Sequence, residues 1–234
     1  MTGAAGDEGL ELTIPVGETI GPVSAILLRP PDARAMLALA HGAGAGMRHR
    51  FMQRLAEVLA GRGIATLRYQ FPYVERGERR PDPPGVLQAT VRAAVARASQ
   101  EAGGLPLLAG GKSLGGRMTS GAAAQRPLEG VQRIVFFGFP LHPAGQPSIT
   151  RAEHLDRVSV PLLFLQGTRD RLAELDLVRE VVGRLGPLAT LHVVEGADHG
   201  FEVLKRSGRT DGDVLGELAE TAAAWGTQGS AAEG

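Results

Sequence analysis

The 234-residue chain has a length typical of one large α/β domain, and its 43% hydrophobic content is enough to form a sizeable core. Its 25 basic and 25 acidic side chains balance, and no long run of one sign occurs, which argues against a nucleic-acid partner. The sequence contains no cysteine, which excludes disulfides, a thiol nucleophile and thiolate metal sites.

The start of the chain carries no recognisable targeting pattern. The start, MTGAAGDEGLEL, lacks a basic segment followed by an apolar one, and no segment is apolar and long enough to cross a bilayer. We therefore expect a cytoplasmic protein without a membrane partner, folded as a single domain over residues 10–226. Residues 1–9 and 227–234 are rich in small residues and are predicted to be flexible.

Along the chain, short apolar runs alternate with helical patterns, which is typical of a mostly parallel sheet covered on both faces. The predicted strands span residues 24–29, 35–40, 64–69, 105–110, 133–137, 161–166 and 190–194. Apolar residues recur at helical spacing over residues 51–59, 87–98, 175–185 and 215–225. The last helix can bury Trp225, the only tryptophan. We predict a doubly wound sheet of seven or eight strands.

In such sheets the ligand site lies at the carboxyl ends of the strands, so the loops that follow the strands matter most for function. These loops begin HGAGAG, QFPYVERGERRPDPP, GKSLGG, GFPLHPAGQPS, GTRD and EGADHGF. We expect the chemistry of the protein to be located in these loops.

The stretch GGKSLGGR, residues 110–117, has two functional interpretations. A Walker phosphate loop needs a glycine where this chain has Pro106, which has no N–H and a fixed φ, so that interpretation fails. Gly-Lys-Ser-Leu-Gly between a strand and a helix instead matches a nucleophile elbow, in which Ser113 occupies a strained turn. An ordinary glycine-rich turn is the alternative.

A serine nucleophile needs an acid and then a histidine at later strand ends. Asp170 follows the apolar run VPLLFLQG, and His199 follows LHVVEG, 29 positions further on. Taken singly, Asp170 could be a helix N-cap and His199 an ordinary loop histidine. Asp198 is the rival acid, but a residue adjacent to the histidine seldom directs its carboxylate at that ring. Asp176 falls within a helical pattern and is expected to be solvated.

The segment LALAHGAGAG, residues 37–46, predicts an oxyanion hole. It runs from a strand into a glycine-rich loop whose backbone N–H of Ala43, together with that of Leu114, is suited to bind an oxyanion. Gly44 is the alternative donor and is also expected to contact the substrate. His41 is expected to orient this loop by hydrogen bonding rather than to perform acid-base chemistry.

These motifs together resemble the α/β-hydrolase superfamily from about Ser24 to Trp225. More closely, HGAGAGMRHRFM, RYQFPY, GGKSLGGRM, GFPLHP, RAEHL, LQGTRD and GADHGF resemble the small dienelactone-hydrolase-like family that includes testis-expressed protein thirty and the third subunit of the NSL acetyltransferase complex. The resemblance implies an α/β-hydrolase fold with a Ser113–Asp170–His199 triad. Dienelactone hydrolases themselves use cysteine where this chain has serine, so their lactone substrate is not implied.

Four further residues are candidates for substrate contact. Phe71 and Tyr73 follow a strand and are expected either to line the acyl or alcohol pocket or to pack in the core. His142 lies on another strand-end loop, where surface exposure without a role is the alternative. Lys112 precedes the proposed nucleophile and is interpreted either as structural or as a contact for an anionic group of the substrate.

The sequence thus predicts a serine hydrolase that cleaves an ester or similar acyl bond of a small molecule, with no cofactor and no metal. The connection of about twenty residues between GTRD and the next strand is too short for a large lid, which favours small or extended acyl substrates. An interaction module that has kept the fold without turnover is the alternative. Oligomeric state is left open.

Overall fold

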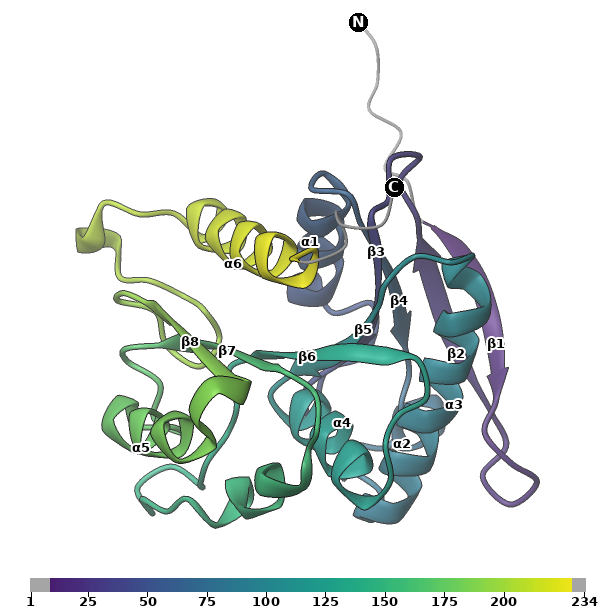
Figure 1. Cartoon of the computed structure of the whole chain (residues 1–234), viewed down its shortest axis with the longest axis horizontal. Helices are drawn as coiled ribbons and strands as arrows, with labels where there is room; N and C mark the ends of the chain where they lie inside the picture. Colours follow the sequence, from purple (N-terminus) through teal and green to yellow (C-terminus); the bar gives the residue numbers. More distant parts are fainter. Residues whose placement is uncertain (1–8, 229–234) are drawn as a thin grey trace, which may run out of the picture.

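The computed structural model describes residues 9–228 and contains an eight-stranded sheet (Figure 1). The strand order is β1-β2-β4-β3-β5-β6-β7-β8, in which β1 and β2 are antiparallel to their neighbours and all later pairs are parallel. The strands are β1 (Leu10–Pro15), β2 (Pro22–Leu28), β3 (Ala35–Ala40), β4 (Ile64–Tyr69), β5 (Leu107–Lys112), β6 (Val131–Phe137), β7 (Leu162–Gly167) and β8 (Ala189–Val194).

Helices cover both faces of this sheet. In Figure 1, α1 and α6 lie together on one face, and α2, α3, α4 and α5 lie on the other. Two apolar clusters correspond to the two faces, since Leu55 and Leu218 belong to one cluster and Val91 and Met118 to the other. The helices are α1 (Arg50–Ala60), α2 (Pro72–Glu75), α3 (Pro84–Ala102), α4 (Leu114–Gln125), α5 (Leu175–Leu185) and α6 (Asp211–Gly226), with three 3-10 turns at η1 (Thr150–Arg157), η2 (Gly186–Leu188) and η3 (Lys205–Ser207).

This architecture confirms the predicted fold class. All seven predicted strands are present, and those at residues 35–40 and 64–69 have the predicted bounds. β1 was not predicted, and β5 starts and ends two residues later than expected. The bounds of β2, β6, β7 and β8 differ from the predicted ranges by one or two residues. The predicted flexible ends lie outside the described residues, except for Gly9, Thr227 and Gln228.

The closing helix α6 forms as predicted. A capping box begins it, in which the Thr210 hydroxyl accepts from the Asp213 N–H and the Asp213 carboxylate accepts from the Thr210 N–H. Trp225 is buried near its end, where the Arg133 guanidinium lies 5.1 Å from the indole ring centroid. The helix packs beside α1 and thereby closes one face of the sheet.

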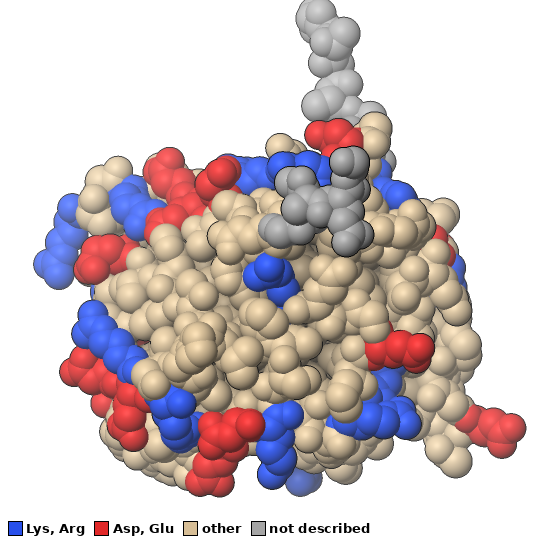
Figure 2. Space-filling model, in the orientation of Figure 1, with Lys and Arg blue, Asp and Glu red and all other residues tan. Residues whose placement is uncertain are grey.

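The loops that follow the parallel strands meet at one edge of the sheet and are not covered by any inserted helical domain in residues 9–228. Within that range no helix is both long enough and apolar enough to pass through a membrane. Figure 2 shows acidic and basic side chains interspersed around the rim of one face, whose middle is mostly uncharged.

Candidate active site

The turn between β5 and α4 holds Ser113 in a strained conformation. Its φ of 51° lies in the left-handed region that residues other than glycine rarely adopt. The neighbouring glycines allow a close approach, because a Cβ at Gly111 or Gly115 would lie 2.5 or 2.6 Å from the Ala40 carbonyl oxygen. The backbones of β5 and α4 therefore cross so closely that only glycine fits at these two positions. The serine projects from the turn, as expected for a nucleophile elbow.

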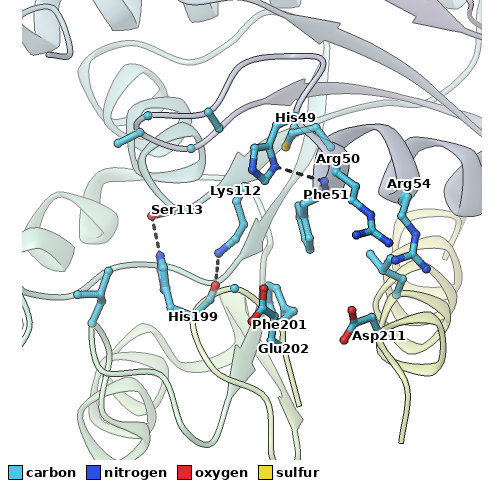
Figure 3. Close-up of a pocket in the computed structure, with 18 residues that line it drawn as sticks. His49, Arg50, Phe51, Arg54, Lys112, Ser113, His199, Phe201, Glu202 and Asp211 are labelled. Atoms are coloured by element: carbon cyan, nitrogen blue, oxygen red, sulfur yellow. Dashed lines mark hydrogen bonds between the residues drawn. The ribbon is translucent and has the colours of Figure 1, made fainter. Parts of the chain in front are cut away.

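The three residues of the predicted triad are brought together from three separate loops. The Ser113 Oγ lies 2.8 Å from His199 Nε2, and His199 Nδ1 lies 2.6 Å from Asp170 Oδ2. The first of these contacts is drawn in Figure 3. Since Nδ1 faces a carboxylate, it carries the ring proton, which leaves Nε2 of the neutral imidazole as a hydrogen-bond acceptor for the serine hydroxyl.

The Asp170 carboxylate is held in place by further donors. The Gln166 side-chain amide donates to Oδ2 at 2.5 Å, and the Leu172 N–H donates to Oδ1 at 2.8 Å. Gln166 is itself oriented, because its carbonyl oxygen accepts from the Phe139 N–H at 3.0 Å. Asp170 is not a helix N-cap, since Glu174 occupies that position of α5. The acid is thus buried and held with Oδ2 against His199.

Asp198, the rival acid, has a different environment. Its Oδ1 accepts from the backbone N–H groups of Gly200 and Glu202, at 2.8 and 3.0 Å. These bonds close a turn in which Phe201 adopts a positive φ of 64°. The carboxylate therefore shapes the loop that carries His199 and does not contact the imidazole.

A cavity of about 470 Å³ opens over Ser113. Of the sequence-predicted residues, Ala43, Gly44, Lys112, Ser113 and His199 lie in its wall. Sequence reasoning did not single out its other side chains, although several lie within the quoted motifs HGAGAGMRHRFM and GADHGF. These are Ala45, His49, Arg50, Phe51, Met52, Arg54, Leu172, Phe201, Glu202, Asp211 and Leu215.

Three predicted substrate contacts are wrong as cavity-lining residues. Phe71 and Tyr73 are fully buried, and their rings stack on each other. The Phe71 ring also makes edge-on contacts with His41 and Tyr69. His142 is also buried, and it borders a separate hollow. The loop after a strand has two sides, and for these three residues the side chain packs toward the interior.

His41 fixes the loop that carries Ala43. Its Nδ1 donates to the Gly42 carbonyl at 2.8 Å, and its Nε2 accepts from the Phe71 N–H at 3.1 Å. Burial lowers the pKa of His41 to about 4, so the ring is neutral near neutral pH, as these two bonds require. The expected orienting role of His41 is confirmed.

Two backbone N–H groups next to Ser113 are free. Among the described residues, neither Ala43 nor Leu114 donates its N–H to any acceptor. The loop approaches the elbow closely at Gly42, where a Cβ would lie 3.7 Å from Ser113 Cβ. Unpaired donors beside a nucleophile are the requirement for binding an oxyanion.

In residues 9–228 no group of three or more His, Asp or Glu side chains is arranged to hold a metal ion.

Comparison with solved structures shows a shared fold. The chain is similar to a dienelactone hydrolase from Anabaena variabilis, with 24% identity, a TM-score of 0.72, and 93% of this chain and 97% of that chain covered. It is also similar to an α/β serine hydrolase without a lid from Xanthomonas campestris, with 23% identity, a TM-score of 0.71 and coverage of 93% and 95%. An α/β serine hydrolase homologue from Coxiella burnetii matches with 20% identity, a TM-score of 0.70 and coverage of 92% and 96%.

The sequence itself matches a family as well as a fold. The family described as Alpha/beta hydrolase domain matches residues 33–227, which include the elbow, the acid and the histidine. The chain therefore belongs to the alpha/beta hydrolase domain family.

Proposed function

We propose that the protein is a serine hydrolase that cleaves an ester or related acyl bond through an acyl-enzyme intermediate. The observation that carries this proposal is the linear arrangement of Ser113, His199 and Asp170, with contacts of 2.8 and 2.6 Å, in which Ser113 and His199 line the cavity. Family membership supports the same reaction class. The names of the similar structures, which include several esterases, are consistent with it.

Each group has a defined task in the proposed reaction. His199 Nε2 takes the Ser113 proton as Oγ attacks the carbonyl carbon, and Asp170 stabilises the imidazolium that forms. The N–H groups of Ala43 and Leu114 bind the tetrahedral oxyanion. The imidazolium returns its proton to the leaving alcohol, which leaves an acyl-Ser113 ester. Water then repeats the sequence of steps and releases the acid.

The shape of the cavity favours small or extended substrates. It measures about 470 Å³, within the range of small-molecule sites, and one wall carries the stacked rings of Phe51 and Phe201. No inserted domain covers it in residues 9–228. The closer relationship to the family of testis-expressed protein thirty is part of this proposal and rests on the motifs quoted above.

Replacement of the nucleophile tests the proposal. Ser113→Ala should abolish hydrolysis of p-nitrophenyl acetate and butyrate, because only the nucleophilic oxygen is removed. Circular dichroism should show an unchanged fold. If purified, folded Ser113→Ala hydrolyses these esters at the wild-type rate, Ser113 is not the nucleophile.

A further inference from the structure

The residue before the proposed nucleophile stands out in a chain that otherwise uses arginine. Of the 25 basic residues, 23 are arginines and only Lys112 and Lys205 are lysines. Arginine has a broad, planar and permanently charged head, whereas lysine carries a compact charge that can be lost when it is buried. Lys112 occupies the position at which this difference can affect the reaction, directly before Ser113.

The Lys112 ammonium is held between two aromatic rings and the histidine loop. Its Nζ lies 5.1 Å from the ring centroid of Phe201 and 5.8 Å from that of Phe51, and the two rings stack 5.9 Å apart. The same Nζ donates a hydrogen bond to the backbone carbonyl of His199 (Figure 3). The side chain thus spans from the elbow to the loop that carries the imidazole.

Gly138, which has no side chain, leaves space next to both the Lys112 ammonium and the His199 imidazole. A Cβ at Gly138 would lie 3.1 Å from Lys112 Nζ and 3.6 Å from both Cε1 and Nδ1 of His199. Gly138 also has a positive φ of 74°, which disfavours other residues. The Lys112 ammonium and the His199 imidazole therefore both lie against the backbone of Gly138, close to each other.

We propose that Lys112 is a positioning residue for His199: its ammonium anchors the His199 carbonyl and thereby holds the imidazole between Ser113 and Asp170. This inference rests on the proposed function. It argues against the interpretation of Lys112 as a contact for an anionic substrate, because the charged head is directed at the histidine loop.

The anchor makes activity depend on the charge of Lys112. A protonated donor makes a stronger hydrogen bond than a neutral amine, so the anchor weakens when the proton is lost. Burial lowers the pKa of Lys112 to about 8, against the opposing effect of the negative charges of Asp170 and Asp198. The ammonium is therefore present below about pH 8 and is lost as the pH rises through that value.

The titratable groups around the Lys112 ammonium differ from those in the rest of the cavity wall. The charges of Asp170 and Asp198 act on the ammonium, which donates to the carbonyl of His199, and α1 faces it with the uncharged ring of Phe51. The remaining titratable side chains in the cavity wall are His49, Arg50, Arg54, Glu202 and Asp211.

Replacement of each lysine by methionine tests the inference. Methionine keeps the unbranched stem and removes the charge. In Lys112→Met, kcat for p-nitrophenyl acetate should fall roughly 10- to 100-fold, the loss expected for a charged hydrogen bond that positions a reacting group. KM should stay within about twofold. Wild type and Lys205→Met should both lose kcat/KM as the pH rises through about 8. Lys112→Met should lack this alkaline decline.

Several outcomes would overturn the inference without affecting the proposed function. One is a Lys112→Met protein with the wild-type kcat and alkaline decline, and another is a raised KM with unchanged kcat, which would indicate a substrate contact. A wild-type protein inactive toward esters would instead overturn the proposed function.

A second measurement needs no variant at position 112. With lysine labelled by ¹³C at Cε, wild-type protein gives two lysine signals, which Lys205→Met assigns. The titration midpoint of Lys112 should coincide with the alkaline decline of kcat/KM. A separation of more than about one pH unit between them contradicts the inference, even if Lys112→Met fails to fold.

Discussion

At the scale of single residues, the sequence is sufficient to predict the Ser113–His199–Asp170 arrangement, because each residue follows a recognisable strand. It did not predict Gln166, which donates to the Asp170 carboxylate from within the buried strand β7. A lone polar residue in the run LLFLQG was the available signal, since a buried amide needs partners. Side-chain direction in a loop leaves no such signal, so the sequence could not decide between pocket and core for Phe71 and Tyr73 and did not predict the burial of His142.

The two acids of the histidine region should differ sharply on substitution. Asp170→Asn should lower kcat roughly 10³- to 10⁴-fold, because an amide stabilises neither the imidazolium nor the required tautomer. Asp198→Asn should lower it less than about tenfold, because the remaining Oδ1 still accepts from Gly200 and Glu202. Ester hydrolysis by both variants measures this. A larger loss of kcat in Asp198→Asn than in Asp170→Asn would show that Asp170 is not the acid of the triad.

At the scale of elements, local sequence failed where pairing between strands decides the structure. The predicted strand ended at Gly110, and the low strand preference of Gly111 gives no local reason to extend it. In the structure Gly111 pairs with both Ala40 and Phe136, so the strand continues to Lys112. Strand β1 was not predicted, although Leu10, Leu12 and Ile14 alternate with polar residues in the pattern of a half-buried strand.

The elbow should tolerate no side chain on its helical arm. In Gly115→Ala the new Cβ would lie 2.6 Å from the Ala40 carbonyl oxygen, so the backbones must separate. We expect a loss of about 1–3 kcal/mol in the free energy of unfolding. Gly183→Ala is the matched control, because that helical glycine of α5 has no atom within 4 Å of a new Cβ. It should stabilise by about 1 kcal/mol. Urea unfolding of both proteins measures the difference, and equal effects would contradict the close crossing.

The hydrogen bonds of His41, which join the loop after β3 to the segment after β4, should contribute less to the free energy of unfolding in acid. Burial lowers the pKa of His41 from 6.5 to about 4, so the unfolded chain binds this proton first as the pH falls. The contribution of His41 to the free energy of unfolding is therefore fully present above pH 6.5. It declines by about 3 kcal/mol as the pH falls from 6.5 to about 4.

Urea unfolding across this pH range measures the contribution of His41. In His41→Gln, the acid-dependent loss of unfolding free energy should be smaller than in wild type by about this amount, because glutamine does not titrate. Parallel pH profiles of the two proteins would show that His41 is not the group responsible.

At the scale of the whole molecule, the fold class was predicted because α/β alternation is visible from β3 to α6. Two antiparallel strands at one edge and the α1–α6 pair complete a scaffold whose loops stay uncovered in residues 9–228. The open cavity is thus a property of the fold and not of one residue.

An uncovered cavity should give ordinary saturation kinetics with dispersed esters. The rate of tributyrin hydrolysis should level off below the solubility limit and show no jump above it, because no lid has to move at an interface. Titration with increasing tributyrin in a pH-stat measures this. A sharp rise in rate once droplets form would indicate a covering segment that opens.

Reaction with a fluorophosphonate probe tests the central claim most directly, since the probe labels only a serine activated by a base. Wild-type protein should be labelled at Ser113, as located by mass spectrometry of the modified peptide. Folded His199→Ala should react at least about 100-fold more slowly, because no base then takes the serine proton. Folded wild-type protein that remains unlabelled, or that carries the probe on a different serine, would contradict the account.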